Sequence, residues 1–157
     1  MTNIRKCIEL IFISMAENGL LPNKKNNGKY VFHDILVDSK GGINTTWCSL
    51  ILSGKEVKVG DKIRIESTNI LPNVLKDSFQ RLKEISAAYE HTVNKNANEQ
   101  QQKNSRQTPE FLESLGNPPY LLQSMTLELC NIILWYANYL EEHDDEELNA
   151  LNWNIIQ

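Results

Sequence analysis

The sequence predicts an α+β fold with an N-terminal helix, a small antiparallel β-meander and a helical C-terminal layer. Apolar residues recur at helical spacing in residues 3–18, short strand-like runs joined by glycine turns fill residues 30–66, and helical spacing returns from residue 73. The 157 residues, 41% of them hydrophobic, suffice to bury a core without disulfide or metal support. We therefore expect one compact domain.

The N-terminal segment is predicted to form an amphipathic helix over residues 3–18. Apolar side chains from Ile4 to Met15 follow one another at steps of three or four and so share one face. Gly19 suits the left-handed position that commonly ends a helix. Glu9 interrupts the apolar stretch, and this argues against a secretory signal sequence because a carboxylate is costly to bury in lipid.

The middle of the chain is predicted to be β-structure. Residues 30–37 and 43–52 are rich in strand formers and flank a glycine turn, and residues 56–59 and 62–66 form a second, shorter pair. Short antiparallel strands joined by tight turns build either an open curved sheet or a small barrel of the OB type. The pattern is compatible with both, so the barrel stays an alternative.

The C-terminal half is predicted to be helical, with one polar interruption. Residues 73–91 have the spacing of an amphipathic helix, and residues 120–143 and 144–153 follow as a long and a short helix. Residues 94–107 contain no large apolar side chain, so burial cannot offset their ordering entropy and a flexible linker is expected. Thr108 begins a short helix after this linker. The predicted parts of the single domain are residues 1–70, 71–93, 94–107 and 108–157.

The long helix carries more apolar residues than one core face needs. Leu127, Leu134 and Trp135 point away from the main stripe. A helix that is apolar on two sides is either central in its fold or in contact with another chain. We therefore expect a homodimer or a tight complex formed through residues 120–140. The stripe itself consists of Leu122, Met125, Leu129, Ile132, Ile133, Tyr136 and Leu140.

Charge is divided unevenly along the chain. Residues 1–78 contain 11 basic and 8 acidic residues, a surplus of three positive charges. Residues 79–157 contain 5 basic and 12 acidic residues, a surplus of seven negative charges. Such an asymmetry is typical of halves that pair partly with each other or that meet different partners.

Cysteine usage and hydropathy bear on the compartment. Cys7, Cys48 and Cys130 are widely spaced and form no CxxC pair, which indicates free thiols of a reducing compartment. No apolar run approaches the roughly 20 residues that span a bilayer. We expect a cytoplasmic protein that does not contact a membrane.

The sequence contains no catalytic motif. Phosphate-binding glycine loops, nucleophile elbows and HExxH zinc motifs are absent, and no histidine lies within four residues of another histidine or a cysteine. His33 and Cys48 are the one pair that strand pairing of residues 30–37 with 43–52 would bring together, but no orienting third residue accompanies them. We expect no enzymatic activity, no cofactor and no metal.

A dense acidic cluster follows the long helix. Bunched carboxylates repel one another, so these side chains must be exposed. Residues 144–147 suit the start of a helix, where the dipole favours negative charge, and this purely structural role is one interpretation. The other is a docking patch for a basic protein surface. The cluster consists of Glu141, Glu142, Asp144, Asp145, Glu146 and Glu147.

Lysines and aromatic residues gather in the N-terminal half. Aromatic rings on a sheet beside lysines can stack on bases and hold phosphates, as in OB-like nucleic-acid-binding modules. The alternative is that the rings belong to the core face of the sheet, since Tyr30 and Phe32 share strand parity. The residues concerned are Lys24, Lys25, Lys29, Tyr30, Phe32 and Trp47.

Three function classes remain, and we rank them. A non-enzymatic protein–protein interaction module, such as an inhibitor, an immunity protein or a complex subunit, comes first because catalytic motifs are absent and the negative surplus suits a partner with a basic surface. A nucleic-acid-binding module that uses the region of residues 24–47 comes second. An enzyme without recognisable motifs comes third.

Overall fold

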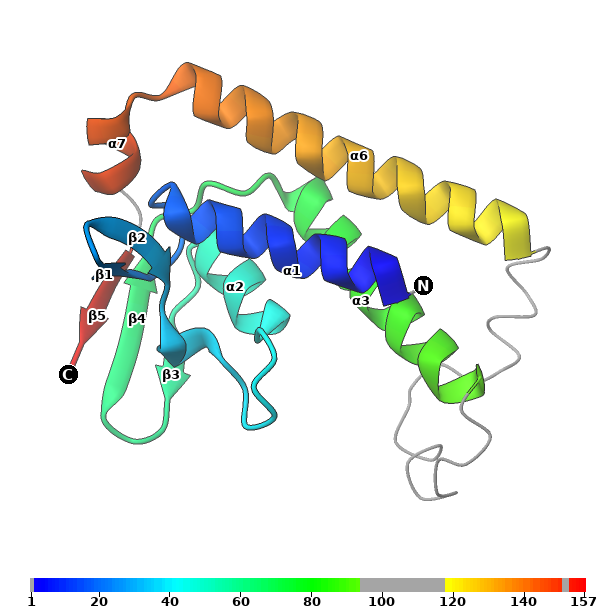
Figure 1. Cartoon of the computed structure of the whole chain (residues 1–157), viewed down its shortest axis with the longest axis horizontal. Helices are drawn as coiled ribbons and strands as arrows, with labels where there is room; N and C mark the ends of the chain where they lie inside the picture. Colours follow the sequence, from blue (N-terminus) through cyan, green and yellow to red (C-terminus); the bar gives the residue numbers. More distant parts are fainter. Residues whose placement is uncertain (1, 94–117, 151–152) are drawn as a thin grey trace.

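The computed structural model describes residues 2–93, 118–150 and 153–157 (Figure 1). The predicted linker of residues 94–107 and the helix predicted from Thr108 lie outside these ranges. The described elements, in chain order, are α1 (Thr2–Glu17), β1 (Asn23–Asn26), β2 (Lys29–Phe32), the 3-10 helix η1 (Asp34–Leu36), α2 (Thr45–Leu52), β3 (Val57–Val59), β4 (Ile63–Ser67), α3 (Asn73–Val93), α6 (Pro118–Glu142), α7 (Asp145–Ala150) and β5 (Trp153–Ile156).

The three long helices pack on one another. α1 contacts both α3 and α6, and in Figure 1 α6 lies along one edge of the molecule with α1 and α3 on a single side of it. Phe12 of α1 is fully buried, and its ring stacks on Phe79 of α3 with 4.9 Å between the centroids. The helices predicted for residues 3–18, 73–91 and 120–143 are confirmed, and the core lies between them.

The second predicted strand, residues 43–52, is wrong, because this segment forms the helix α2. The Asn44 side chain accepts a hydrogen bond from the Trp47 backbone N–H at 3.1 Å and so caps the helix N-terminus. Cys48, Ile51 and Leu52 are buried at helical spacing. β-Branched residues in this segment imitate a strand, whereas the cap and the burial pattern select a helix.

The first predicted strand is shorter than expected. Strand β2 ends at Phe32, and the His33 side chain then caps the 3-10 helix by accepting a hydrogen bond from the Ile35 backbone N–H at 3.1 Å. The predicted turn at residues 38–42 is present: the Asp38 N–H donates to the Gly42 carbonyl at 2.7 Å. A single bridge between Val37 and Ile43 closes it, in place of the predicted strand pair.

The strands form two small antiparallel sheets instead of one meander, and within the described ranges they close no barrel. β1 pairs with β2 around Asn27 and Gly28, whose φ angles of 49° and 80° are those of a tight hairpin turn. β3 and β4 pair as predicted, and fully buried Ile65 lies on β4. The α+β class is confirmed, and the barrel alternative is not.

The C-terminal strand β5 was not predicted. It pairs with β4 in antiparallel register, with Ile155 opposite Ile65. The sequence places Trp153 at the end of a short helix, but that helix, α7, ends at Ala150 and Trp153 begins the strand. The Trp153 indole Nε1 donates to the Gly19 carbonyl at 3.1 Å, which ties the strand to the end of α1. None of the described helices combines the length and apolarity needed to cross a bilayer.

Candidate functional site

Helix α6 is held to the body of the protein by one apolar face. Leu121, Met125, Leu129, Ile132 and Tyr136 are buried at helical spacing. The predicted stripe differs from this set: Leu122 and Ile133 are exposed, Leu140 is only partly buried, and Leu121, which the prediction left out, is buried. Leu127 and Leu134, predicted to point away from the core, are exposed as expected. Trp135, predicted to point away with them, instead packs partly against the core.

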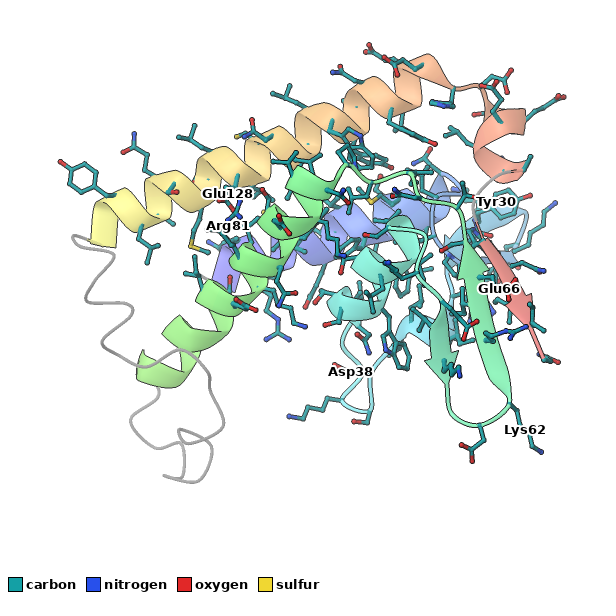
Figure 2. All side chains as sticks on the ribbon, turned by 180° about the vertical axis from the view of Figure 1, so that it is seen from behind. Tyr30, Asp38, Lys62, Glu66, Arg81 and Glu128 are labelled. Atoms are coloured by element: carbon teal, nitrogen blue, oxygen red, sulfur yellow. The ribbon has the colours of Figure 1, made fainter. Side chains whose placement is uncertain are left out.

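Polar contacts fix α6 against α1 and α3. The Tyr136 hydroxyl lies 2.9 Å from the Ser14 hydroxyl and accepts a hydrogen bond from the Asn18 side-chain amide at 3.0 Å. Burial raises the pKa of the Tyr136 phenol above its ordinary value, although these two hydrogen bonds act in the opposite direction. Arg81 of α3 donates through Nε to Glu128 of α6 at 2.9 Å (Figure 2). Rotation of α6 about its axis is therefore restricted.

The outward side of α6 carries exposed apolar side chains among uncharged polar ones. Leu127 and Leu134 are each 61% exposed, and Leu122, Cys130 and Ile133 are exposed beside them. At about 100° per residue these five side chains fall within an arc of roughly 140°. We call this set the α6 outer face.

Charged residues are also missing from the rest of the exposed side of α6 between Tyr120 and Asn138. From Tyr120 to Asn138 every exposed residue is uncharged. Glu128, the one charged residue in that interval, is partly buried and forms an ion pair with Arg81. The 19 residues of this interval extend over about 28 Å of helix. A solvated helix normally carries charged residues on such a face, so this uncharged length is the unusual feature of the surface.

The acidic cluster begins where α6 ends, but its six carboxylates are not equivalent. Asp144 accepts a hydrogen bond from the Glu147 N–H at 2.9 Å, and Glu147 accepts one from the Asp144 N–H at 3.2 Å. This reciprocal pair is a capping box that starts α7. His143 donates through Nδ1 to the Tyr139 carbonyl at 2.9 Å and stacks on the Tyr139 ring, which stabilises the corner between α6 and α7.

Four acids of the cluster take no part in the capping box. Glu141, Glu142, Asp145 and Glu146 are exposed and have no ion-pair partner among the described residues. Their negative charge lies at the C-terminal end of the α6 outer face. We call these four residues the acidic corner.

The basic and aromatic residues do not form one platform. Lys24, Lys25, Lys29 and Tyr30 lie on the β1–β2 hairpin, with Lys25 Nζ 5.9 Å from the centre of the Tyr30 ring. Phe32 packs partly against the core. Lys24 pairs with Asp34 and holds the pKa of that carboxyl below its usual value. Trp47, expected on the adjacent strand, lies on helix α2 and is half-buried.

His33 and Cys48 do not form a nucleophile pair. The His33 ring nitrogen Nδ1 is engaged as the cap of the 3-10 helix. Cys48 is fully buried, and loss of water raises the pKa of its thiol far above the ordinary range, which disfavours the reactive thiolate. Within residues 2–93, 118–150 and 153–157, no three His, Cys, Asp or Glu side chains are grouped to hold a metal ion.

Sequence reasoning identified the acidic cluster and part of the α6 outer face but missed Leu122, Cys130 and Ile133. These residues could have been found from the lack of charged residues between Glu128 and Glu141. A search for apolar residues at helical spacing does not detect such a lack. Comparison with known proteins found no match: no family model fits the chain, and neither a curated protein nor a solved structure is significantly similar to it.

Proposed function

We propose that this protein is a non-enzymatic docking module that binds another protein through the α6 outer face and the acidic corner. The observation that carries the proposal is the uncharged, leucine-rich exposed side of a helix whose opposite face already fills the core. Exposed apolar side chains gathered on one surface are typical of protein–protein contact sites. Inhibitors, immunity proteins and complex subunits belong to this class.

The partner expected for this surface has an apolar groove or helix face with basic residues at one end. Apolar anchors such as Leu127 and Leu134 provide the desolvated centre of an interface. The acidic corner would guide approach, because complementary charge raises association rates. A second copy of the chain fits less well, since α6 contains no lysine or arginine to meet the acidic corner.

The first experiment is affinity capture from nuclease-treated native extract with two matched baits. One bait carries Leu127→Ser and Leu134→Ser, and the control carries Leu10→Ser and Val74→Ser, whose side chains are 63% and 67% exposed on α1 and α3. Both pairs replace apolar groups of similar exposure, so they have similar effects on stability and solubility. We expect a partner that the wild-type chain and the control retain and the α6 variant loses.

A thiol footprint then locates the contact. Cys130 lies on the α6 outer face and Cys7 on α1, and both are exposed. Bound partner is expected to slow alkylation of Cys130 and leave that of Cys7 unchanged. Equal protection of both thiols, or capture that survives Leu127→Ser and Leu134→Ser, would contradict the proposal.

Two further outcomes assign other functions. A light-scattering mass of twice 18.0 kDa that returns to the monomer value in the α6 variant would identify a second copy as the occupant. Retention of nucleic acid that decreases steeply with salt and is lost in a Lys25→Gln, Lys29→Gln variant would favour the nucleic-acid-binding class.

A further inference from the structure

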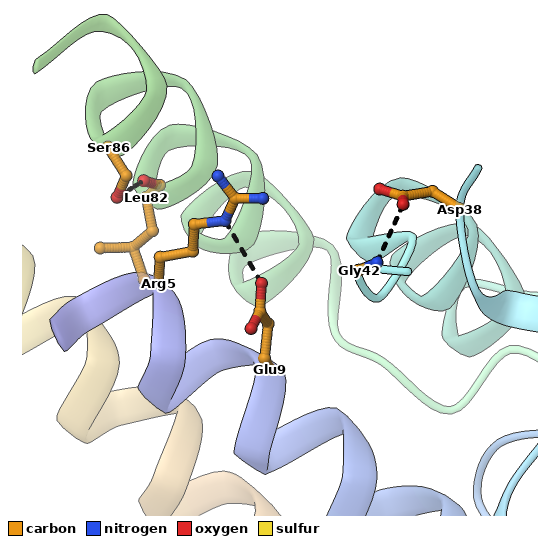
Figure 3. A network of polar contacts seen from close by, with 6 residues as sticks. All are labelled: Arg5, Glu9, Asp38, Gly42, Leu82 and Ser86. Atoms are coloured by element: carbon orange, nitrogen blue, oxygen red, sulfur yellow. Dashed lines mark hydrogen bonds and ion pairs between the residues drawn. The ribbon is translucent and has the colours of Figure 1, made fainter. Parts of the chain in front are cut away.

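A pocket opens between α1, α3 and the segment that enters α2. Its volume is about 140 Å³, and its lining includes Ile8 and Phe12 of α1, Phe79 and Lys83 of α3, and Ile43 before α2. Figure 3 shows this region: α1 with Arg5 and Glu9, α3 with Leu82 and Ser86, and the Asp38–Gly42 turn facing them. The pocket is separate from the α6 outer face.

The floor of the pocket is apolar and preformed. Ile8, Phe12 and Phe79 are buried, and the two aromatic rings stack with 22° between their planes. The volume is close to that of an engineered apolar cavity of about 150 Å³ that accepts a benzene molecule. The space therefore suits a rigid body about the size of one aromatic ring.

Both charged side chains in the described lining of the pocket, Arg5 and Lys83, are basic. Burial lowers the pKa of the Lys83 ammonium; the charge of Glu84 acts against this shift, and repulsion by Arg5 adds to it. An anion placed between Arg5 and Lys83 would relieve this repulsion and replace part of the missing hydration.

The neighbouring carboxylates have donors of their own. Glu9 accepts a hydrogen bond from Arg5 Nε at 3.3 Å, and Glu84 accepts one from the Gln80 amide. Asp38 accepts hydrogen bonds from the N–H groups of Lys40 at 2.8 Å and Gly42 at 2.9 Å. Glu9 is thus an ion-pair partner of Arg5, and Lys83 Nζ donates to the Thr46 hydroxyl, so a bound carboxylate would share Arg5 with Glu9 and Lys83 with Thr46.

We propose that this pocket binds a small monocarboxylate, with an apolar body the size of one ring on Phe12 and Phe79 and its carboxylate between Lys83 and Arg5. Thr45, the first residue of α2, also lines the mouth, so the positive end of that helix dipole favours the same charge. The apolar body provides affinity by burial and the carboxylate provides selectivity.

The test is a charge series of equal size, followed by two-dimensional amide NMR on the wild-type chain. Benzoate, benzyl alcohol and benzylamine share the ring and differ in charge. We expect benzoate to bind with a Kd on the order of 1 mM or tighter, benzyl alcohol about tenfold more weakly, and benzylamine more weakly still. Shifted amides should belong to residues of α1, α3 and the start of α2.

Variants separate the role of charge from that of the cavity. Lys83→Gln should weaken benzoate about tenfold and leave benzyl alcohol unchanged, whereas Lys76→Gln, the same change on α3 outside the pocket, should alter neither. Ser49→Leu places a larger side chain in the lining and should abolish binding of both. Equal affinities across the charge series, shifts mapped to another surface, or no binding of benzoate at about ten times the expected Kd would each overturn the proposal.

Discussion

Tyr136→Phe tests whether polar contacts at the inner face of α6 hold the helix in place. The hydroxyl of Tyr136 meets the Ser14 hydroxyl at 2.9 Å and the Asn18 amide at 3.0 Å, so one oxygen joins α6 to α1 and the residue after it. The substitution removes that oxygen and leaves the ring and its packing in place. Asn18 keeps its second hydrogen bond, from its side-chain amide to the Ser14 carbonyl at 2.8 Å.

The expected loss follows from these contacts. Each hydrogen bond of this kind contributes about 1 kcal/mol net, and no charge is left buried without a partner. The free energy of unfolding should therefore fall by about 1–2 kcal/mol at neutral pH. For a urea m-value near 2 kcal/mol/M, the midpoint should decrease by roughly 0.5–1 M with no change in m.

The pH dependence provides a second, independent readout. Because burial raises the pKa of the Tyr136 phenol in the folded state, folding favours the protonated form. The resulting contribution to the free energy of unfolding is fully present below the ordinary tyrosine pKa of about 10. It is lost as pH rises through the folded-state pKa. Above pH ~10 the free energy of unfolding of the wild-type protein should therefore fall more steeply than that of Tyr136→Phe. The difference in stability between the two proteins should become smaller. Tyr139, whose pKa is also raised by burial, is present in both proteins and forms a common background.

The measurement is urea unfolding followed by tryptophan fluorescence, at neutral pH and in steps above pH ~10. A stability difference below about 0.3 kcal/mol at neutral pH would show that water replaces both contacts at no cost. Parallel curves at high pH would show that the phenol titrates alike in the folded and unfolded states. Either result would refute the reasoning.

Three further predictions follow from the fold. Gly19→Ala should lower the free energy of urea unfolding by more than about 2 kcal/mol, because φ is +83° and a Cβ would lie 2.6 Å from the Leu148 carbonyl oxygen. Gly28 is the control: its φ is +80° but the space around it is open, so Gly28→Ala should lower it by only about 1 kcal/mol. Ile65→Ala should cost about 2–5 kcal/mol by the same assay, since Ile65 is fully buried on the central strand of the three-stranded sheet. A disulfide reagent should modify two cysteines in the native protein and Cys48 only after unfolding.

Long amphipathic segments were predictable because local pattern and tertiary burial agree in them. α1, α3 and α6 each bury one face at the helical period, so spacing alone locates them. The failure at α2 has a local cause: eight residues are too few for a clear period, and the Asn44 cap outweighs the strand preference of Thr45 and Thr46.

The remaining elements depend on partners that lie far away in sequence. β5 has four residues, and it exists because β4 offers an unpaired edge some 90 residues earlier in the chain. The pocket requires Arg5, Thr45 and Lys83 at one place, and nothing in their local sequence relates them. The acidic cluster was visible in the sequence, but its division into a capping pair and a free acidic corner depends on the geometry at Asp144 and Glu147.

The character of the α6 outer face is not explained by the needs of the fold. α3 belongs to the same helical layer, and its described exposed residues include Asp77, Arg81, Lys83 and Glu84. Charged residues are thus exposed along α3, whereas none is exposed on α6 between Tyr120 and Asn138. Exposed leucines on α6 contribute nothing to core burial and increase the risk of aggregation. A charged face would serve the packing of the described residues as well or better, which is the reason we propose contact with another molecule at this face. Leu127 and Leu134 are the residues at which the proposal can be tested.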